Sequence, residues 1–196
     1  MITIVEGADF AGKTTYCLDK CWSHVRNGER SAYIHFPIRK NDDVIISDLT
    51  ETMFTECGEL VGDMTKIQHI ILENIIVNAK SILTLHSEGY NVYVDRYLLS
   101  NIVYRQLHNI PMEQVVDGFV KILMRIAKHE IMVHDDEVLK ERCKANTIYG
   151  DELDTINEQL ENVLKANHIY ATYHAEGNNV WVKKLIAELD IKQETH

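Results

Sequence analysis

Apolar residues follow two patterns along the chain: short runs, and longer segments in which they recur every three or four positions. The short runs are typical of buried β-strands, and the longer segments are typical of amphipathic helices. Strands are predicted at residues 2–5, 31–36, 90–94, 131–134 and 168–173. Helices are predicted at 13–27, from 42 or 43 to about 54, at 64–87, from after 97 to about 107, at 112–128, from 135 or 136 to about 144, at 151–167 and at 179–190.

This alternation of strands and helices predicts an α/β fold with a five-stranded parallel sheet and right-handed crossovers. The helix at 64–87 has a wide apolar stripe, which indicates burial on more than one side, in the core or against a second subunit. The apolar side of the first helix is expected to consist of Leu18, Cys21, Trp22 and Val25. With 196 residues, 45% of them hydrophobic, and no repeat or linker, residues 1–196 fit a single domain.

The first strand is followed by Gly7, four further residues, and then Gly12-Lys13-Thr14, which opens the first helix. This is the G-x4-G-K-[ST] phosphate loop in its required place between a strand and a helix. Glycines let the backbone N–H groups form a ring, and the helix N-terminus adds its positive dipole. Lys13 is therefore expected to reach the β- and γ-phosphates of a nucleotide, and the Thr14 hydroxyl to bind the Mg²⁺ that bridges them.

Composition narrows the remaining possibilities. The formal charge of −10 makes a broad nucleic-acid surface a poor hypothesis, and no apolar run approaches the ~18 residues of a membrane span. The N-terminus lacks the pattern of a secretory signal, and the four cysteines lack zinc or disulfide spacing, so they are interpreted as reduced thiols of a cytoplasmic protein. His134 and the three acidic residues after it are better explained as an acidic helix start than as a metal site, and no structural metal is predicted.

Ligands of parallel sheets bind beyond the carboxyl ends of the strands, and charged residues follow two of these ends. Asp95-Arg96 comes directly after a strand, where a carboxylate can hold Mg²⁺ through water and an arginine can grip an acceptor phosphate with two N–H groups. An ion pair with Asp95 capping a helix is an equally good interpretation. Arg39 follows the second strand by three residues and is a solvated cation or a second clamp on the same acceptor.

Three motifs in this order resemble the thymidylate kinase family. They are Glu6-Gly7-x-Asp9-x-x-Gly12-Lys13-Thr14-Thr15, Phe36-Pro37-x-Arg39, and Asp95-Arg96-Tyr97-x-x-Ser100-x-x-Val103-Tyr104. A weaker match, Ile148-Tyr149-Gly-Asp151, resembles the lid of the poxviral members and places a lid segment at about 135–152. The resemblance implies a cytoplasmic, homodimeric P-loop kinase that moves the γ-phosphoryl group of ATP, with Mg²⁺, to a deoxynucleoside monophosphate. Its partners would then be small-molecule nucleotides, not nucleic acid or membrane.

The resemblance also implies roles for single residues. ATP would be bound by Gly7, Gly12, Lys13, Thr14, Thr15, Arg142 and Asn178, with Arg142 stacked on the adenine. The acceptor would be bound by Asp9, Phe36, Arg39, Asn74, Arg96, Ser100, Tyr104, Arg105 and Tyr149. Within that set, Asp9 would hold the 3′-hydroxyl, both Arg39 and Arg96 the monophosphate, and Tyr104 would pack beneath the sugar. Thr14 and Asp95 would hold Mg²⁺, partly through water, and the catalytic group would be Lys13, Arg96, Asp95, Arg39 and Asp9.

Two departures from the family pattern concern the catalytic cation and the base pocket. The family's loop arginine is replaced by Phe10, which leaves Lys144, Lys140, Arg142 or Arg105 to cover the transferring group, with Lys144 favoured. The family's base-stacking aromatic and base-reading arginine fall on Ile71 and Ile75. Of this base motif only Asn74 remains, either in the pocket or on the solvent side, and Gln68 is a candidate to compensate. The divergence favours a viral or phage origin, and predicts that dTMP and dUMP are both acceptors.

Two other functions share the sheet and the phosphate loop. A deoxynucleoside kinase would use a strand-end carboxylate as a base toward a 5′-hydroxyl and would not need two arginines on its acceptor. A nucleotide-dependent switch or binding module would need an unambiguous magnesium aspartate on a separate strand and an effector surface, and neither is clear in the sequence.

Overall fold

The structure, a computed structural model, describes residues 1–37, 64–111, 117–146 and 153–191. Four parallel strands form one sheet in the order β2-β3-β1-β4. They are β1 (Ile2–Gly7), β2 (Ser31–His35), β3 (Asn91–Asp95) and β4 (Lys128–Met132). Every residue of β1 is buried, as expected for the most apolar run at the centre of a parallel sheet.

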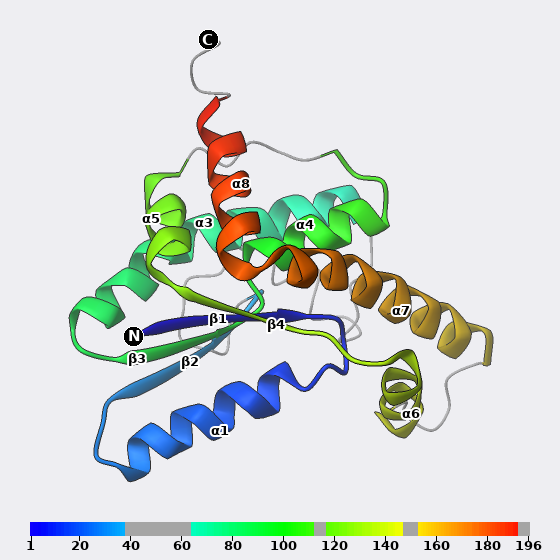
Figure 1. The fold of residues 1–196 in the computed structure, drawn as a ribbon, viewed down its shortest axis with the longest axis horizontal. Coiled ribbons are helices and arrows are strands. Elements are labelled where there is room, and N and C mark those ends of the chain that lie inside the picture. Colours follow the sequence, from blue (N-terminus) through cyan, green and yellow to red (C-terminus); the bar gives the residue numbers. More distant parts are fainter. Residues whose placement is uncertain (38–63, 112–116, 147–152, 192–196) are drawn as a thin grey trace.

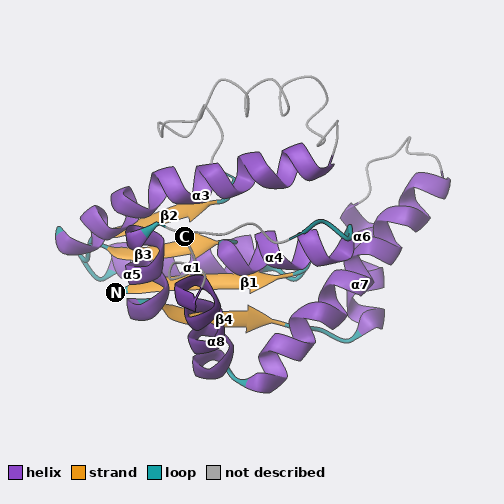
Figure 2. Cartoon of the chain, turned by 90° about the horizontal axis from the view of Figure 1, so that it is seen from above, coloured by secondary structure: helices purple, strands orange, loops and turns teal. Residues whose placement is uncertain are grey.

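Helices cover the two faces of the sheet unequally (Figure 1). One face is covered by α1 (Lys13–Arg26). The other carries α3 (Met64–Ser87), α4 (Leu98–Leu107), α5 (Gly118–Ile126), α7 (Leu153–Glu176) and α8 (Asn178–Ile191). The short helix α6 (Asp136–Asn146) follows β4 and packs against α7. Seen from above, all four strand arrows point toward the end of the sheet where α6 and the N-terminal part of α7 lie (Figure 2).

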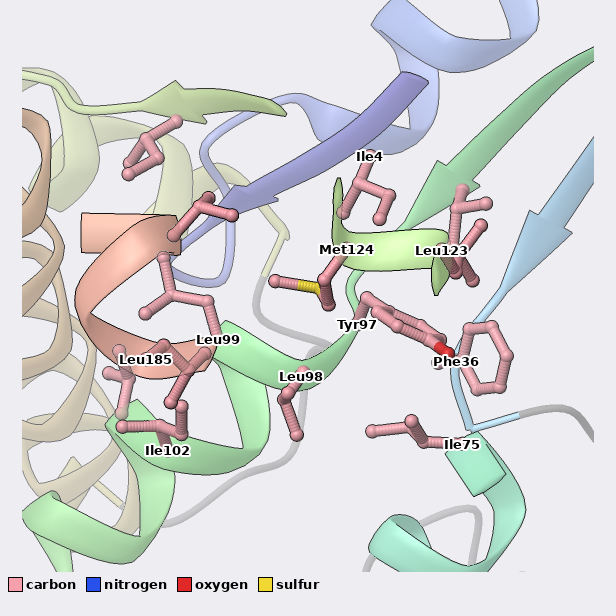
Figure 3. Close-up of a cluster of buried hydrophobic side chains, with 14 of the residues drawn as sticks. Ile4, Phe36, Ile75, Tyr97, Leu98, Leu99, Ile102, Leu123, Met124 and Leu185 are labelled. Carbon is pink, nitrogen blue, oxygen red and sulfur yellow. The ribbon is translucent and has the colours of Figure 1, made fainter. Parts of the chain in front are cut away.

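The main core lies on the face with several helices. Ile4 of β1, Leu99 and Ile102 of α4, and Leu123 of α5 belong to one buried cluster (Figure 3). This cluster fixes the carboxyl ends of β1 and β3 relative to α4, which begins directly after β3.

The predicted fifth strand, 168–173, is wrong, because these residues lie inside α7. Their aromatic and β-branched residues favour a strand, yet the buried positions Val163, Ala166 and Tyr170 are three and four apart and continue a helical face. The described residues therefore form a four-stranded sheet, and β4 is at its edge.

Two smaller expectations also need correction. The fourth strand begins at Lys128 rather than 131, because Ala127 already has extended backbone angles and ends α5. On α1, the residues that face the sheet are Cys17 and Cys21, whereas Leu18, Trp22 and Val25 are exposed. The predicted helix between 42 and 54 lies outside the described residues.

None of the described helices combines the length and the apolar character that crossing a membrane requires.

Candidate active site

The phosphate loop connects β1 to α1. Gly7 has φ 154°, and a Cβ there would lie 2.7 Å from the carbonyl oxygen of Met132, so a side chain does not fit. Gly12, with φ 88°, is the last residue before the helix. The Nζ of Lys13 donates to the carbonyl oxygen of Ala8 at 2.7 Å, which keeps the ammonium group inside the loop. Burial, together with the nearby charge of Arg96, lowers the pKa of Lys13 to about 8.

Asp95, the last residue of β3, is the acceptor of several hydrogen-bond donors. Its Oδ2 receives the hydroxyl of Thr14 at 2.6 Å and the hydroxyl of Tyr33 at 3.2 Å, and the Nδ1 of His35 lies 3.1 Å away. Burial alone would raise the pKa of this carboxyl group, but His35, Thr14 and the charge of Lys13 outweigh it and lower the pKa to about 2. Asp95 is therefore a carboxylate across the physiological pH range.

The Oδ1 of Asp95 and the hydroxyl oxygen of Thr14 together fit Mg²⁺. The Oδ1 of Asp95 is buried and has no hydrogen-bond partner in the described part of the chain, and the Thr14 hydroxyl lies beside the carboxylate. A hydroxyl and a carboxylate are hard oxygen ligands of the kind Mg²⁺ takes when phosphates and water complete its shell. Among the described residues, no group of three or more His, Cys, Asp or Glu side chains forms a metal site made of protein ligands alone.

Asp9, Arg96 and Tyr104 form a second cluster. The Nη2 of Arg96 donates to Oδ1 of Asp9 in a short ion pair, and the Tyr104 hydroxyl donates to Oδ2 of Asp9 at 2.5 Å. Burial opposes ionisation of Asp9, but Arg96 and Lys13 outweigh it and lower the pKa of the carboxyl group. Arg96 has φ 66°, an uncommon angle for a residue with a side chain, and it directs the guanidinium toward the phosphate loop. The interpretation of Asp95 as a helix cap paired with its neighbour is therefore wrong, because Arg96 pairs with Asp9 and the N-cap of α4, Tyr97, has no side-chain hydrogen bond.

Glu6 is a structural carboxyl group that the sequence did not single out beyond its motif. Its Oε1 accepts the backbone N–H groups of Tyr97 and Leu99, and its Oε2 accepts the hydroxyl of Ser100, so Glu6 binds the start of α4. Burial raises the pKa of Glu6 to about 7 against the opposing hydrogen bond of Ser100. Ser100 also contacts the hydroxyl of Tyr170 at 2.8 Å.

The phosphate loop, Asp95 and Arg96 line one cleft of about 900 Å³ at the carboxyl ends of the strands, and Glu6 lies behind it in the core. The predicted residues that line it are Asp9, Gly12, Lys13, Thr14, Thr15, Asp95, Arg96 and Arg142. His134, which the sequence places at a strand end and so at this cleft, lines it as well, and His35 and His174 line it without having been predicted. Histidines at strand ends in this sequence were a usable signal, because His35 directly precedes the Phe36-Pro37 motif and His134 is the last residue of the fourth predicted strand.

Four predicted acceptor residues lie elsewhere. Phe36 is 1% exposed and packs edge-on against Tyr97 in the core (Figure 3). Ser100 is bound to Glu6 and Tyr170, as described above. Asn74 is 6% exposed, so the solvent-side interpretation of this residue is wrong.

Arg105 is the fourth of these residues and is 1% exposed. It donates to the Oδ1 of Asn101 and to the carbonyl oxygen of Pro111. This burial removes it as a candidate for covering a transferring phosphoryl group. Lys144, the favoured candidate, is exposed on α6 and does not line the cleft.

The remaining predicted residues are only partly described. Arg39 and Tyr149 lie outside the described residues. Asn178 begins α8 just after the turn at Gly177. Gly7 opens the phosphate loop, and Tyr104 reaches the cleft through Asp9.

The described residues form an α/β fold with a phosphate loop at the carboxyl ends of a parallel sheet. No family model matches the sequence, and no curated protein matches it either. Among solved structures, the thymidylate kinase of Candida albicans aligns with TM-score 0.57 at 16% identity, over 98% of this chain and 92% of that one. The YorR protein of Bacillus subtilis, solved in complex with phosphorylated GDP, aligns with TM-score 0.50 at 16% identity, over 100% and 99%. The chain therefore has a thymidylate kinase-like fold, with four described strands instead of the expected five.

Proposed function

We propose that this protein is an ATP-dependent kinase of deoxynucleoside monophosphates, with dTMP and dUMP as its acceptors. The observation that carries the proposal is that two cationic groups line one cleft: Lys13 in the phosphate loop and Arg96 just after β3. Two carboxylates, Asp9 and Asp95, line the same cleft, and Asp9 pairs with Arg96. A protein that only binds or hydrolyses a nucleotide needs the first group. A second, arginine-based group suits a second phosphate.

The reaction requires positioning and charge stabilisation more than covalent chemistry. An anionic oxygen of the acceptor monophosphate attacks the γ-phosphorus of ATP, and the bond to the bridging oxygen of ADP breaks. Lys13 and the loop N–H groups stabilise the charge that develops on the phosphoryl oxygens. Thr14 and Asp95 would hold Mg²⁺, which neutralises the β- and γ-phosphate oxygens when bound. No general base is needed, because the attacking oxygen is already ionised.

The sugar of the acceptor is assigned to the Asp9–Tyr104 pair. Asp9 is ionised and offers an oxygen to a 3′-hydroxyl once the nucleotide displaces part of its contact with Arg96. Tyr104 is held against Asp9, and its ring lies 5.5 Å from the Arg96 guanidinium. A ring in that place would exclude a 2′-hydroxyl. Arg96 is then released to the monophosphate, shared with Arg39 as the resemblance implies.

Gln68 is proposed as the side chain that reads the base, although it is 3% exposed and does not line the cleft in this structure. Its amide orientation follows from a chain of hydrogen bonds. Arg105 can only donate, so the atom of Asn101 that it contacts at 3.1 Å is Oδ1. The Nδ2 of Asn101 then donates to the Oε1 of Gln68 at 2.9 Å. The remaining Nε2 of Gln68 is a donor, and a donor suits the 4-keto oxygen of thymine or uracil better than the 4-amino group of cytosine.

A coupled ADP-release assay with nucleosides and nucleoside monophosphates tests the proposal. We expect turnover with dTMP and dUMP, and none with thymidine or without an acceptor. Turnover of thymidine would favour a deoxynucleoside kinase, and acceptor-independent hydrolysis would favour a nucleotide switch. Arg96→Ala should weaken use of the monophosphate by about 2–4 kcal/mol in kcat/KM while ATP binding is retained. The homodimer, the cytoplasmic location and the viral or phage origin stay predictions.

A further inference from the structure

The backbone carbonyl groups of the phosphate loop have side-chain donors of their own. The Nη1 of Arg142 donates to the carbonyl oxygens of Phe10 and of Ala11, at 3.2 Å in each case. The Nε2 of His134 lies 2.8 Å from the same Ala11 oxygen. Two side chains from beyond β4 therefore bind the loop through its main chain, next to Gly12.

The chemistry of these atoms fixes the proton on His134. A carbonyl oxygen can only accept, so Nε2 of His134 carries a hydrogen and donates it to Ala11. Nη1 of Arg142 is 3.3 Å from that nitrogen. Because both nitrogens are donors, this contact is not a hydrogen bond, and the two side chains meet only through the Ala11 oxygen that they share. That oxygen has two lone pairs and receives one donor on each.

Both donors are held by elements that pack together. His134 follows β4, and its backbone is bound on both sides by the side-chain amide of Asn167 from α7, with the His134 N–H donating at 3.3 Å and Nδ2 donating to the His134 carbonyl at 2.8 Å. Asn167 is 2% exposed. Arg142 comes from α6, which packs on α7. The end of β4, α6 and α7 thus position the two donors together.

The consequence for the loop follows from peptide geometry. In a trans peptide the carbonyl of one residue and the N–H of the next point in opposite directions. Holding the Ala11 carbonyl toward His134 and Arg142 therefore directs the Gly12 N–H to the opposite side, into the loop. Gly12, at φ 88°, adopts conformations on both sides of φ 0° at little cost, so the glycine itself does little to keep its peptide in one orientation.

We propose that His134 and Arg142 are positioning residues that hold the Ala11–Gly12 peptide with its N–H toward the phosphates of the bound nucleotide. The inference rests on the proposed function, in that the loop binds a nucleoside triphosphate. It differs from the role that the family resemblance implies for Arg142, which is contact with the adenine. A residue that acts on the loop affects every ligand with a triphosphate equally, whereas a residue that stacks on the base affects only ligands that have one.

Calorimetric titration of the full chain with MgATP, MgGTP and inorganic tripolyphosphate separates the two roles. We expect His134→Ala to raise the Kd for all three ligands by the same factor, about tenfold for one lost hydrogen bond that orients a binding group. Arg142→Ala should raise all three by a common factor at least as large. His134→Gln, whose Nε2 can donate from nearly the same place, should restore binding to within about twofold.

Glu137→Gln is the matched control, because Glu137 lies on the same helix, does not line the cleft and pairs only with Lys140 among the contacts described. It should leave all three affinities unchanged, and melting curves of every variant establish that the fold is intact. Arg142 is only partly buried, so its variant remains informative if His134→Ala does not fold.

Three results would overturn the inference while leaving the proposed function in place: no change in either alanine variant, loss of ATP and GTP affinity with tripolyphosphate unaffected, or a His134→Gln variant as weak as His134→Ala. Wild-type protein that binds ATP but not tripolyphosphate would also contradict it. Failure of wild-type protein to bind any of the three ligands would instead refute the proposed function, and the inference with it.

Discussion

The two faces of the sheet are built for different tasks. The face under several helices carries the large apolar cluster that includes Ile4 and Leu123. The face under α1 alone has a small cluster of Val5, Cys17, Cys21 and Tyr93, with partly buried tyrosines around it. On that face, tyrosine hydroxyls bind polar groups, as Tyr33 binds Asp95 and Tyr93 binds His24. The stability of the domain therefore resides mainly on one face, while the other combines a thin core with part of the site.

Two carboxyl groups at neighbouring strand ends make the difference visible. We call the face of the sheet under several helices the thick face. The side chain of Glu6 points to this face, as those of Ile2 and Ile4 do, whereas the side chain of Asp95 points to the face of α1, as that of Tyr93 does. Burial raises the pKa of Glu6 to about 7, and the donors around Asp95 lower its pKa to about 2. Successive side chains of a strand point to opposite faces of the sheet. Asp95 lies opposite Val5 of the neighbouring strand, so Glu6, one position further on, points to the other face, and the two carboxyl groups have different roles.

The largest effect on stability is expected on the thick face. Leu123→Ala, at a fully buried position, should lower the free energy of unfolding by about 2–5 kcal/mol, because it removes buried area and leaves a cavity. Trp22→Ala on α1 should change it by less than about 0.5 kcal/mol, because the side chain is 57% exposed. Urea unfolding of both variants decides the comparison. A greater loss at Trp22 would mean that the α1 face is covered in solution.

The next effect is catalytic and belongs to the phosphate loop. Lys13→Ala should lower kcat by about a hundredfold to a thousandfold, because it removes a charge directed at the developing transition state. The free energy of unfolding should change little, since burial already disfavours this ammonium group and its main contact is one carbonyl of the loop. The measurements are kcat at saturating ATP and acceptor, and urea unfolding of the same variant. Folded protein with near wild-type kcat would refute the kinase assignment.

The sequence predicted the parts of the molecule in which local pattern and tertiary structure agree. The strand at 2–5, the phosphate loop and the strand ending at Asp95 agree because each combines a strong apolar run with a turn that only certain residues allow. Residues 168–173 failed because aromatic and β-branched residues suit both a strand and a buried helix face, and tertiary packing selected the helix. Likewise, the apolar spacing of Leu18, Trp22 and Val25 predicts a buried side of α1, but these three side chains are exposed. Among the described residues, the sheet packs against the narrower side of α1 that carries Cys17 and Cys21.

The candidate site residues likewise include some that could be predicted from the sequence and some that could not. Lys13, Thr14 and Asp95 were predictable because their motif requires a fixed backbone. The side chain that each arginine contacts was not, since a flexible side chain reaches several partners from one backbone position. Arg96 binds Asp9, Arg105 lies in a buried amide network, and Arg142 binds loop carbonyls.

A smaller effect, dependent on pH, should distinguish Glu6. Its pKa is about 7 in the folded protein and near 4.5 in the unfolded chain, so the folded state binds more protons between these values. The contribution of protonated Glu6 to the free energy of unfolding is therefore complete below pH 4.5 and is lost as the pH rises through 7. The loss amounts to up to about 3 kcal/mol, at 1.36 kcal/mol per pKa unit.

Glu6→Gln keeps the acceptor oxygen for α4 without the ionisation, so it should lose this dependence. The difference in unfolding free energy between wild type and variant, measured by urea unfolding from pH 5 to pH 8, isolates Glu6 from the other titrating groups. A constant difference across that range would contradict the raised pKa. The outcome also tests whether the thick face tolerates a charge at all.

The smallest predicted effect concerns the acceptor base, and it depends on helices of the thick face. The positions of the family's base motif carry two aliphatic residues, Ile71, which is partly buried, and Ile75, which is fully buried in the core. Neither of them supplies an aromatic wall around the 5-methyl group. We therefore expect dTMP and dUMP to lie within about tenfold of each other in kcat/KM. Because Gln68 is held as a donor, dCMP should be the poorer acceptor, and Gln68→Glu, which offers only acceptor oxygens, should narrow or reverse that gap. Glu73→Gln on the exposed side of α3 is the control and should leave all ratios unchanged. The measurement is kcat/KM for the three monophosphates with each variant. A dTMP preference above a hundredfold would mean that another residue surrounds the methyl group, and an unchanged dCMP ratio in Gln68→Glu would remove Gln68 from the base site.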